Sequence, residues 1–316
     1  MRRLAAWLVL LLCPAAALAQ DKIIVSGASG QLGSLVIEEL LKRDVAPEDL
    51  ILVSRTPNTD HLQRYAARGA SVRFGDFTEP DSLDEAYRGG TRMLLISINA
   101  GGGNRPELHK AAIDAAARAG VKHIAYTSYV NADRNDASTI AVDHRRTETY
   151  LKESGVAWTM LRNHIYANGL VDQAIMIVRD GGLVTHTPDA RVAYVTREDC
   201  AAAAAAVLTT PGHENRAYNI TGPEAVGPRE LVALASEISG KAAELIVLSE
   251  AEYRQRLADS GMPAAAIEGT ISFAAELDSP HLGEPSTAVQ ELTGRLATSV
   301  RDLLLANRER LRAAAR

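Results

Sequence analysis

Three glycines, Gly27, Gly30 and Gly33, follow an apolar run at residues 22–26 and open a stretch whose apolar residues recur every three or four positions. This pattern predicts a tight turn between a buried strand and an amphipathic helix. Gly27 permits the turn, Gly30 lets the backbone approach a ligand, and Gly33 lets the helix lie close to the strand. Because the first N–H groups of such a helix bind phosphate, the loop indicates a dinucleotide site.

Short runs rich in aliphatic residues alternate with longer helical patterns through the first half of the chain. The runs predict strands at residues 22–26, 50–54, 71–74, 92–97, 123–127 and 157–161. Several of them are continuously apolar, which is typical of parallel strands covered by helices on both faces. We therefore predict a Rossmann-type, doubly wound parallel sheet.

The second half of the chain is less regular. Residues 191–196 and 217–221 have the composition of strands, and the alanine run at 201–206 between them predicts a closely packed helix. Beyond Gly227 the pattern is mainly helical and ends in a charged helix at 308–316. We expect this part to form a small C-terminal α/β lobe, so that residues 20–316 make up one cofactor-binding unit.

The first nineteen residues have the layout of a signal peptide. Two arginines precede the apolar run 4–12, and small residues lead up to Ala19. The run is too short for a stable membrane span. We expect cleavage after Ala19 and a periplasmic or secreted protein; the alternative is a mis-assigned start codon and a cytoplasmic protein. After cleavage Cys200 is the single cysteine, so the mature chain can form no internal disulfide.

Charge and motifs exclude several function classes. The formal net charge is −5 and the sequence has no long basic run, which argues against nucleic acid as a partner. The sequence contains no His-Glu-x-x-His, Gly-x-Ser-x-Gly or cysteine cluster, and its eight histidines are scattered. We therefore expect no metal site and no hydrolase chemistry.

Arg55 follows the second predicted strand, where an NAD-specific domain usually carries an acidic residue for the ribose 2′-hydroxyl. A guanidinium can hold a 2′-phosphate through two parallel hydrogen bonds, so Arg55 favours NADP(H) as the cofactor. The alternative is an ordinary surface arginine. Asp76 and Phe77, after the third strand, are expected beside the adenine; a turn aspartate and a core phenylalanine are equally compatible with the pattern.

Five segments together resemble the NmrA-like atypical short-chain dehydrogenases, in particular bacterial NADPH:quinone oxidoreductases. They are residues 27–33, 54–55, 94–97, 124–128 and 161–163. The resemblance implies that the pyrophosphate is bound by Gly27, Ser29, Gly30, Gln31, Leu32 and Gly33, and the 2′-phosphate by Arg55. It places Asp76, Phe77 and Ser97 beside the adenine and ribose. It places Thr127, Ser128, Tyr129 and Asn163 beside the nicotinamide.

The helix that carries a tyrosine and a lysine four residues later in typical short-chain dehydrogenases has His144 and Glu148 at that spacing. His144 and Tyr129 are therefore the candidate catalytic residues, although His144 and Glu148 are equally compatible with a packing pair. Hydride transfer to a quinone requires mainly alignment. We predict an NADPH-dependent reductase of quinones or similar conjugated carbonyl compounds. A non-enzymatic NADP-binding regulator is the alternative, and the possibility of a homodimer is left open.

The leader generates the first testable prediction. Expression in a bacterial host should yield a periplasmic protein that begins at Gln20, because the layout before it matches an export signal. Intact-mass measurement of a periplasmic fraction checks this. Recovery from the cytosol alone, with Met1 attached, would contradict export.

Overall fold

The computed structural model describes residues 21–98, 104–134 and 139–316 of the 316-residue chain. The predicted leader at 1–19 lies outside the described residues. None of the helices in the described part has the length and apolar character needed to cross a membrane.

Seven parallel strands form the central sheet in the order β3-β2-β1-β4-β5-β6-β8. Their bounds are β1 Ile23–Ser26, β2 Leu50–Ser54, β3 Ser71–Phe74, β4 Arg92–Leu95, β5 His123–Tyr129, β6 Ala157–Asn163 and β8 Arg216–Ile220. The order reverses between β1 and β4, which opens a crevice at the carboxyl ends of these strands. The predicted doubly wound Rossmann sheet is confirmed.

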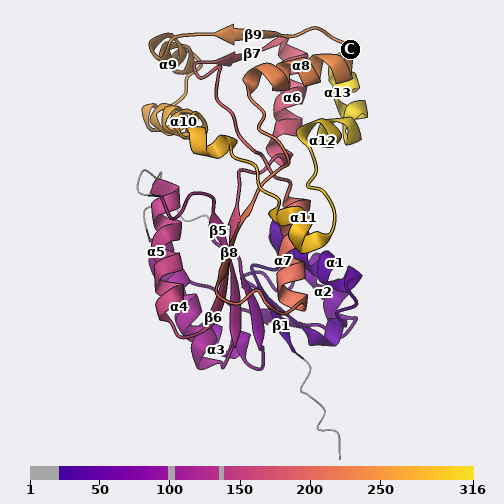
Figure 1. Cartoon of the computed structure of the whole chain (residues 1–316), viewed down its shortest axis with the longest axis vertical. Coiled ribbons are helices and arrows are strands. Elements are labelled where there is room, and N and C mark those ends of the chain that lie inside the picture. The colour runs from indigo at the N-terminus through magenta and orange to yellow at the C-terminus, as the bar shows by residue number, and fades with distance from the viewer. Residues whose placement is uncertain (1–20, 99–103, 135–138) are drawn as a thin grey trace, which may run out of the picture.

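Helices cover both faces of the sheet (Figure 1). On one face α1, α2, α7 and α11 enclose one apolar cluster, and on the other face α3, α4 and α5 enclose a second. These helices are α1 Gln31–Lys42, α2 Asp60–Ala66, α7 Arg197–Thr209, α11 Ala288–Thr293, α3 Pro80–Tyr87, α4 Arg105–Arg118 and α5 Thr139–Glu153; a 3₁₀ turn, η1 Pro47–Asp49, precedes β2. Because both faces are covered, the central strands are buried along their length and their apolar runs need not alternate.

The predicted alanine helix is α7, and its alanines at 201–206 are all buried. Small side chains let α7 pack directly between α1 and the sheet. The strand predicted at 191–196 is wrong, because this segment makes only isolated bridges, Val192 with Val226 and Val195 with Tyr166. The segment is apolar because it is buried where the chain runs from the lobe to α7. Composition alone does not distinguish a buried connection from a buried strand.

A smaller α/β lobe stands above the carboxyl edge of the sheet (Figure 1). Its two parallel strands, β7 Gly182–Thr185 and β9 Glu244–Val247, were not predicted, since both are short and partly exposed. The remaining elements are α6 Asn168–Asp180, α8 Pro228–Ser239, α9 Glu250–Asp259, α10 Ala264–Leu277, η2 Pro280–Gly283, α12 Val300–Ala306 and α13 Arg308–Ala314. The lobe buries its own apolar cluster between α6, α8, α12 and α13.

Candidate functional site

The turn after β1 brings α1 into close contact with the sheet. Gly27 has φ +91°, a conformation that side chains disfavour, and its N–H donates to the carbonyl of Val53 at 3.0 Å. A Cβ on Gly33 would lie 2.3 Å from the Gly27 carbonyl oxygen, so this position accepts only glycine. The first N–H groups of α1 consequently point into the crevice between β1 and β4 and can bind an anion.

A cavity of about 480 Å³ lies beside this turn. Its lining includes seven of the residues predicted to contact a dinucleotide: Gly27, Ser29, Gly30, Arg55, Asp76, Phe77 and Ser97. Gln31 is exposed at the start of α1, whereas Leu32 and Gly33 are buried beneath the turn, and these three do not line the cavity. The cavity thus joins the carboxyl ends of β1, β2 and β4 in one continuous wall.

Arg55 is exposed in the wall of this cavity, and its guanidinium has no ion-pair partner among the described residues. A cluster of hydroxyl groups lies beside it: the Ser29 and Ser54 Oγ atoms are 2.7 Å apart, and the Thr56 N–H donates to Ser54 Oγ at 3.0 Å. A free guanidinium next to hydroxyl donors suits a phosphate. The sequence analysis missed Ser54 and Thr56, although both adjoin Arg55 in the chain.

Asp76 and Phe77 form the far wall of the cavity. Asp76 Oδ1 accepts from the backbone N–H and the hydroxyl of Thr78, both at 2.9 Å, so this carboxylate also holds its own turn. Phe77 is buried, and its ring meets that of His109 edge to face with centroids 6.3 Å apart. Both residues therefore combine a structural role with a place in the cavity lining.

Thr127 and Ser128, at the end of β5, are buried and do not line the cavity. Thr127 Oγ1 accepts from the Ser97 N–H at 2.8 Å and holds that residue in the cavity wall. The Ser128 hydroxyl donates to Glu148 Oε1 at 2.7 Å. These contacts give Thr127 and Ser128 supporting positions behind the crevice.

Glu148 is held in a buried ion pair. Arg162 binds both of its carboxylate oxygens, with Nε to Oε1 at 2.9 Å and Nη2 to Oε2 at 2.8 Å, and also donates to Asp133 at 2.6 Å. Breaking such a pair would leave an uncompensated buried charge. Glu148 therefore joins α5 to β6 through this ion pair.

His144 belongs to a buried polar network behind the crevice. Its Nδ1 lies 2.7 Å from the Tyr126 hydroxyl, which is also 3.2 Å from Nδ1 of His109. Burial, assisted by the nearby Arg105 charge, lowers the pKa of His144 to about 3. The ring of Tyr129 stacks on His144 with centroids 6.0 Å apart. At neutral pH His144 is therefore an uncharged hydrogen-bonding group, and the geometry does not bring it to the cavity wall.

The carboxyl end of β6 carries a buried polar atom that lacks a partner. Within the described residues Asn163 Oδ1 has no hydrogen bond, while Asn163 Nδ2 lies 3.4 Å from the Tyr166 hydroxyl. Tyr166 is itself fixed by the Arg197 guanidinium, 4.7 Å from its ring centroid. A buried amide oxygen without a donor is costly, so this position suits a bound group that carries an N–H.

A second cavity, of about 450 Å³, extends from Tyr166 into the lobe. Its walls are mainly aliphatic and aromatic, with the rings of Tyr166, Tyr194, Tyr253 and Phe273 among them. Its lining contains no Asp, Glu, Lys, Arg or His side chain. This arrangement places an uncharged cavity next to the end of the crevice marked by Asn163.

The comparisons with known proteins agree with this geometry. The family model described as NAD(P)H-binding matches residues 27–211. The chain is 34% identical to quinone oxidoreductase 2 of Escherichia coli over 87% of its own length and 98% of that protein. It therefore belongs to the NAD(P)H-binding family, among its NmrA-like NAD(P)H-dependent oxidoreductases.

Other members of the family differ in the acceptor that their names specify. An NAD(P)H azoreductase of Xenophilus azovorans is 26% identical, covering 87% of this chain and 94% of that protein. The solved structure of Citrobacter sp. triphenylmethane reductase complexed with NADP(H) superimposes with a TM-score of 0.81 at 33% identity, covering 90% of this chain and 98% of that one. These proteins thus share a family described as NAD(P)H-binding, and their names specify different acceptors.

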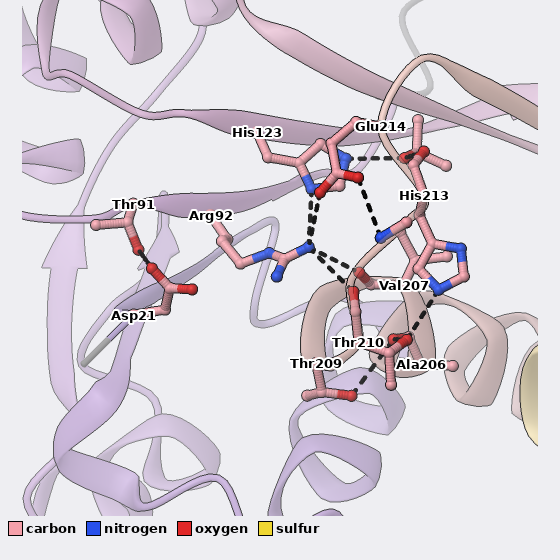
Figure 2. A network of polar contacts seen from close by, with 12 residues as sticks. Asp21, Thr91, Arg92, His123, Ala206, Val207, Thr209, Thr210, His213 and Glu214 are labelled. Atoms are coloured by element: carbon pink, nitrogen blue, oxygen red, sulfur yellow. Dashed lines mark hydrogen bonds and ion pairs between the residues drawn. The ribbon is translucent and has the colours of Figure 1, made fainter. Parts of the chain in front are cut away.

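A further polar network lies at the opposite, amino-terminal edge of the sheet of this NmrA-like oxidoreductase, away from the cofactor crevice (Figure 2). His123, at the start of β5, is 3.2 Å from Arg92 Nη2 and 2.8 Å from the Thr159 hydroxyl. Arg92 also donates to the carbonyl of Val207 at 3.2 Å. The network therefore ties β4, β5 and β6 to the end of α7 and has a structural role.

We predict that the free energy of unfolding depends on pH, because four histidine side chains are buried. Burial lowers the pKa of His109 and His144 to about 3 and that of His123 and His164 to about 4. Since the unfolded value is about 6.5, the unfolded chain binds protons first as the pH falls. The stabilisation is therefore complete above about pH 6.5 and is lost below it, by about 2 kcal/mol at pH 5 for each imidazole that stays neutral.

Urea unfolding between pH 7.5 and pH 5 measures this loss before most carboxylates titrate. The His123→Gln variant, which keeps a polar group near Arg92 and Thr159, should show a shallower decline than the wild type. A free energy of unfolding that stays constant over this range would contradict the prediction.

Proposed function

We propose that the protein transfers a hydride from NADPH to a neutral, ring-bearing acceptor, a quinone or a similar conjugated carbonyl compound, bound in the apolar cavity. The observation that carries this proposal is the cavity lining, which offers aromatic rings and no charged side chain. An ionised acceptor would lose its hydration there without gaining a counter-charge. Neutral acceptors whose flat rings pack against Tyr194, Tyr253 and Phe273 fit best.

Residues of this chain suit both ends of the cofactor. The 27–33 turn with the start of α1 would hold the pyrophosphate, and Arg55 with the hydroxyls of Ser29 and Ser54 would hold the 2′-phosphate. The unpartnered Asn163 Oδ1 would accept from a carboxamide N–H. When bound, NADPH supplies the hydride, and the protein contributes binding and alignment.

The protonation states favour an acceptor that needs little acid catalysis. His144 is neutral, and Glu148 is held by Arg162, so neither offers an acidic proton to the cavity. Tyr166, in the cavity wall, can donate a hydrogen bond to an acceptor oxygen. A quinone delocalises the added charge, whereas a simple ketone develops an alkoxide that needs a proton or strong donors. We therefore expect that no single proton donor is indispensable.

The names of the relatives support a reductase of bulky conjugated compounds, since quinones, azo compounds and triphenylmethanes all appear among them. They do not favour the non-enzymatic regulator. Export through the predicted leader and assembly as a homodimer are further parts of this proposal.

Acceptor charge provides the test of function. We expect purified protein to oxidise NADPH with menadione and to show a kcat/KM at least about tenfold lower with its sulfonated analogue, because the sulfonate cannot be paired in the cavity. Absorbance at 340 nm follows the reaction, and NADPH with each acceptor but without protein is the control. Equal rates with both acceptors, or no oxidation with either, would contradict the proposal.

Arg55 provides the test of cofactor choice. Arg55→Ala should weaken NADPH binding by about tenfold to a hundredfold and leave NADH binding nearly unchanged, because only NADPH carries the 2′-phosphate. Fluorescence titration with both dinucleotides measures this. Arg88→Ala, which removes an exposed arginine paired with Glu85 and outside the cavity, is the matched control. If Arg55→Ala still preferred NADPH over NADH as strongly as the wild type does, another group would have to bind the 2′-phosphate.

A further inference from the structure

Helix α10 lies between two cavities that differ in the side chains that line them. Its face at Thr270, Phe273, Ala274 and Leu277 lines the apolar cavity described above. The adjoining face, at Ser272, Ala275 and Glu276, lines a polar cavity of about 300 Å³ against the β5–α5 connection. Residues three and four positions apart share a helix face, so the placement of α10 decides the shape of both cavities.

The α9–α10 hairpin has little buried surface of its own to hold it there. None of the residues of α9 is buried, and α10 buries only Ile267 and Ile271. Arg254 of α9 binds Glu250 and Glu268, contacts that hold the hairpin to itself and not to the sheet. Figure 1 shows both helices on the outer side of the lobe, above α5. A segment with few buried apolar contacts opens at a lower free energy than a core helix.

The segment that follows α10 is held against the rest of the protein by buried contacts. Leu282, in η2, is buried in a small apolar cluster with Val130 and Val192, and its carbonyl accepts from the Ala193 N–H at 2.7 Å. This contact fixes the end of the hairpin, but it lies five residues past Leu277. Within α10, the last residue of the helix, Leu277, packs against this cluster, so a second contact near the same end would fix how the helix is placed.

Glu276 provides such a contact. The Tyr129 hydroxyl, at the end of β5, donates to Glu276 Oε1 at 2.7 Å and so joins the Rossmann sheet to α10. Stacking on His144 restricts the Tyr129 ring. Burial and the neighbouring Glu276 charge raise the pKa of the Tyr129 phenol, which therefore stays protonated as a donor. A hydrogen bond from a fixed donor to a carboxylate is among the stronger single contacts.

We propose that Glu276 is a positioning residue for the acceptor: its hydrogen bond from Tyr129 holds α10 in place as one wall of the apolar cavity. The acceptor binds against the adjoining face of the same helix, through Phe273 and Leu277. The expected effect on acceptor binding rests on the proposed function. It assigns Tyr129 to the same anchor, in place of a direct proton transfer to the acceptor.

The expected kinetic effect is on acceptor binding. Glu276→Ala should raise the KM for menadione about tenfold, change kcat less than about twofold, and leave the affinity for NADPH unchanged. Glu276→Gln keeps an oxygen that accepts from Tyr129 and should restore most of the acceptor affinity. Asp278→Ala, which removes an exposed carboxylate at the end of the same helix and outside both cavities, should behave as the wild type.

Hydrogen exchange supplies a readout that does not depend on turnover. Backbone amides of residues 264–277 should exchange faster in Glu276→Ala and in Tyr129→Phe, by similar factors, and no faster in the double variant. Unchanged exchange in Glu276→Ala, a loss of kcat without a change in KM, or an equal effect of Asp278→Ala would overturn the inference. If the wild type reduces no acceptor, the proposed function fails, and the exchange comparison still decides whether Glu276 anchors α10.

Discussion

The contact between Gly33 and the Gly27 carbonyl is the constraint on which the cofactor site depends. With no Cβ at Gly33, α1 approaches the carboxyl end of β1 closely enough that its first N–H groups face the crevice. The same approach buries Leu32 and Val36 against α7, whose alanines leave room for α1. Packing on this face of the sheet and phosphate binding at its edge are therefore consequences of one close backbone contact.

The absence of the tyrosine–lysine pair changes what α5 contributes. The positions that would carry catalytic groups instead hold His144, neutral and bonded to Tyr126, and Glu148, paired with Arg162. Because these buried polar groups satisfy one another, they stabilise the wall behind the crevice. They also leave the acceptor cavity without a strong acid. This arrangement supports the proposed hydride transfer to an acceptor that needs no strong acid.

In the proposed function the lobe binds the acceptor. Its cavity is formed where α6 and β7 meet α10, so the residues that line it and those that line the cofactor crevice come from different parts of the chain. Such a division would allow one dinucleotide site to serve different acceptors, in line with the quinones, azo compounds and triphenylmethanes in the names of the relatives. We propose in addition that the hydrogen bond from Tyr129 to Glu276 helps to place α10, so one wall of this cavity depends on a contact that lies outside the cavity.

Local features of the sequence were sufficient to predict the Rossmann sheet, the glycine turn and the position of Arg55, since each depends on residues within one βα unit. The apolar run 191–196 was mistaken for a strand, and β7 and β9 were missed, because short segments of the lobe owe their conformation to distant partners. The tertiary structure alone decided that Glu148 faces Arg162 and that Tyr129 meets Glu276, 147 residues away. Periodicity shows which face of an element is buried, whereas the partner of a polar group depends on how the elements pack.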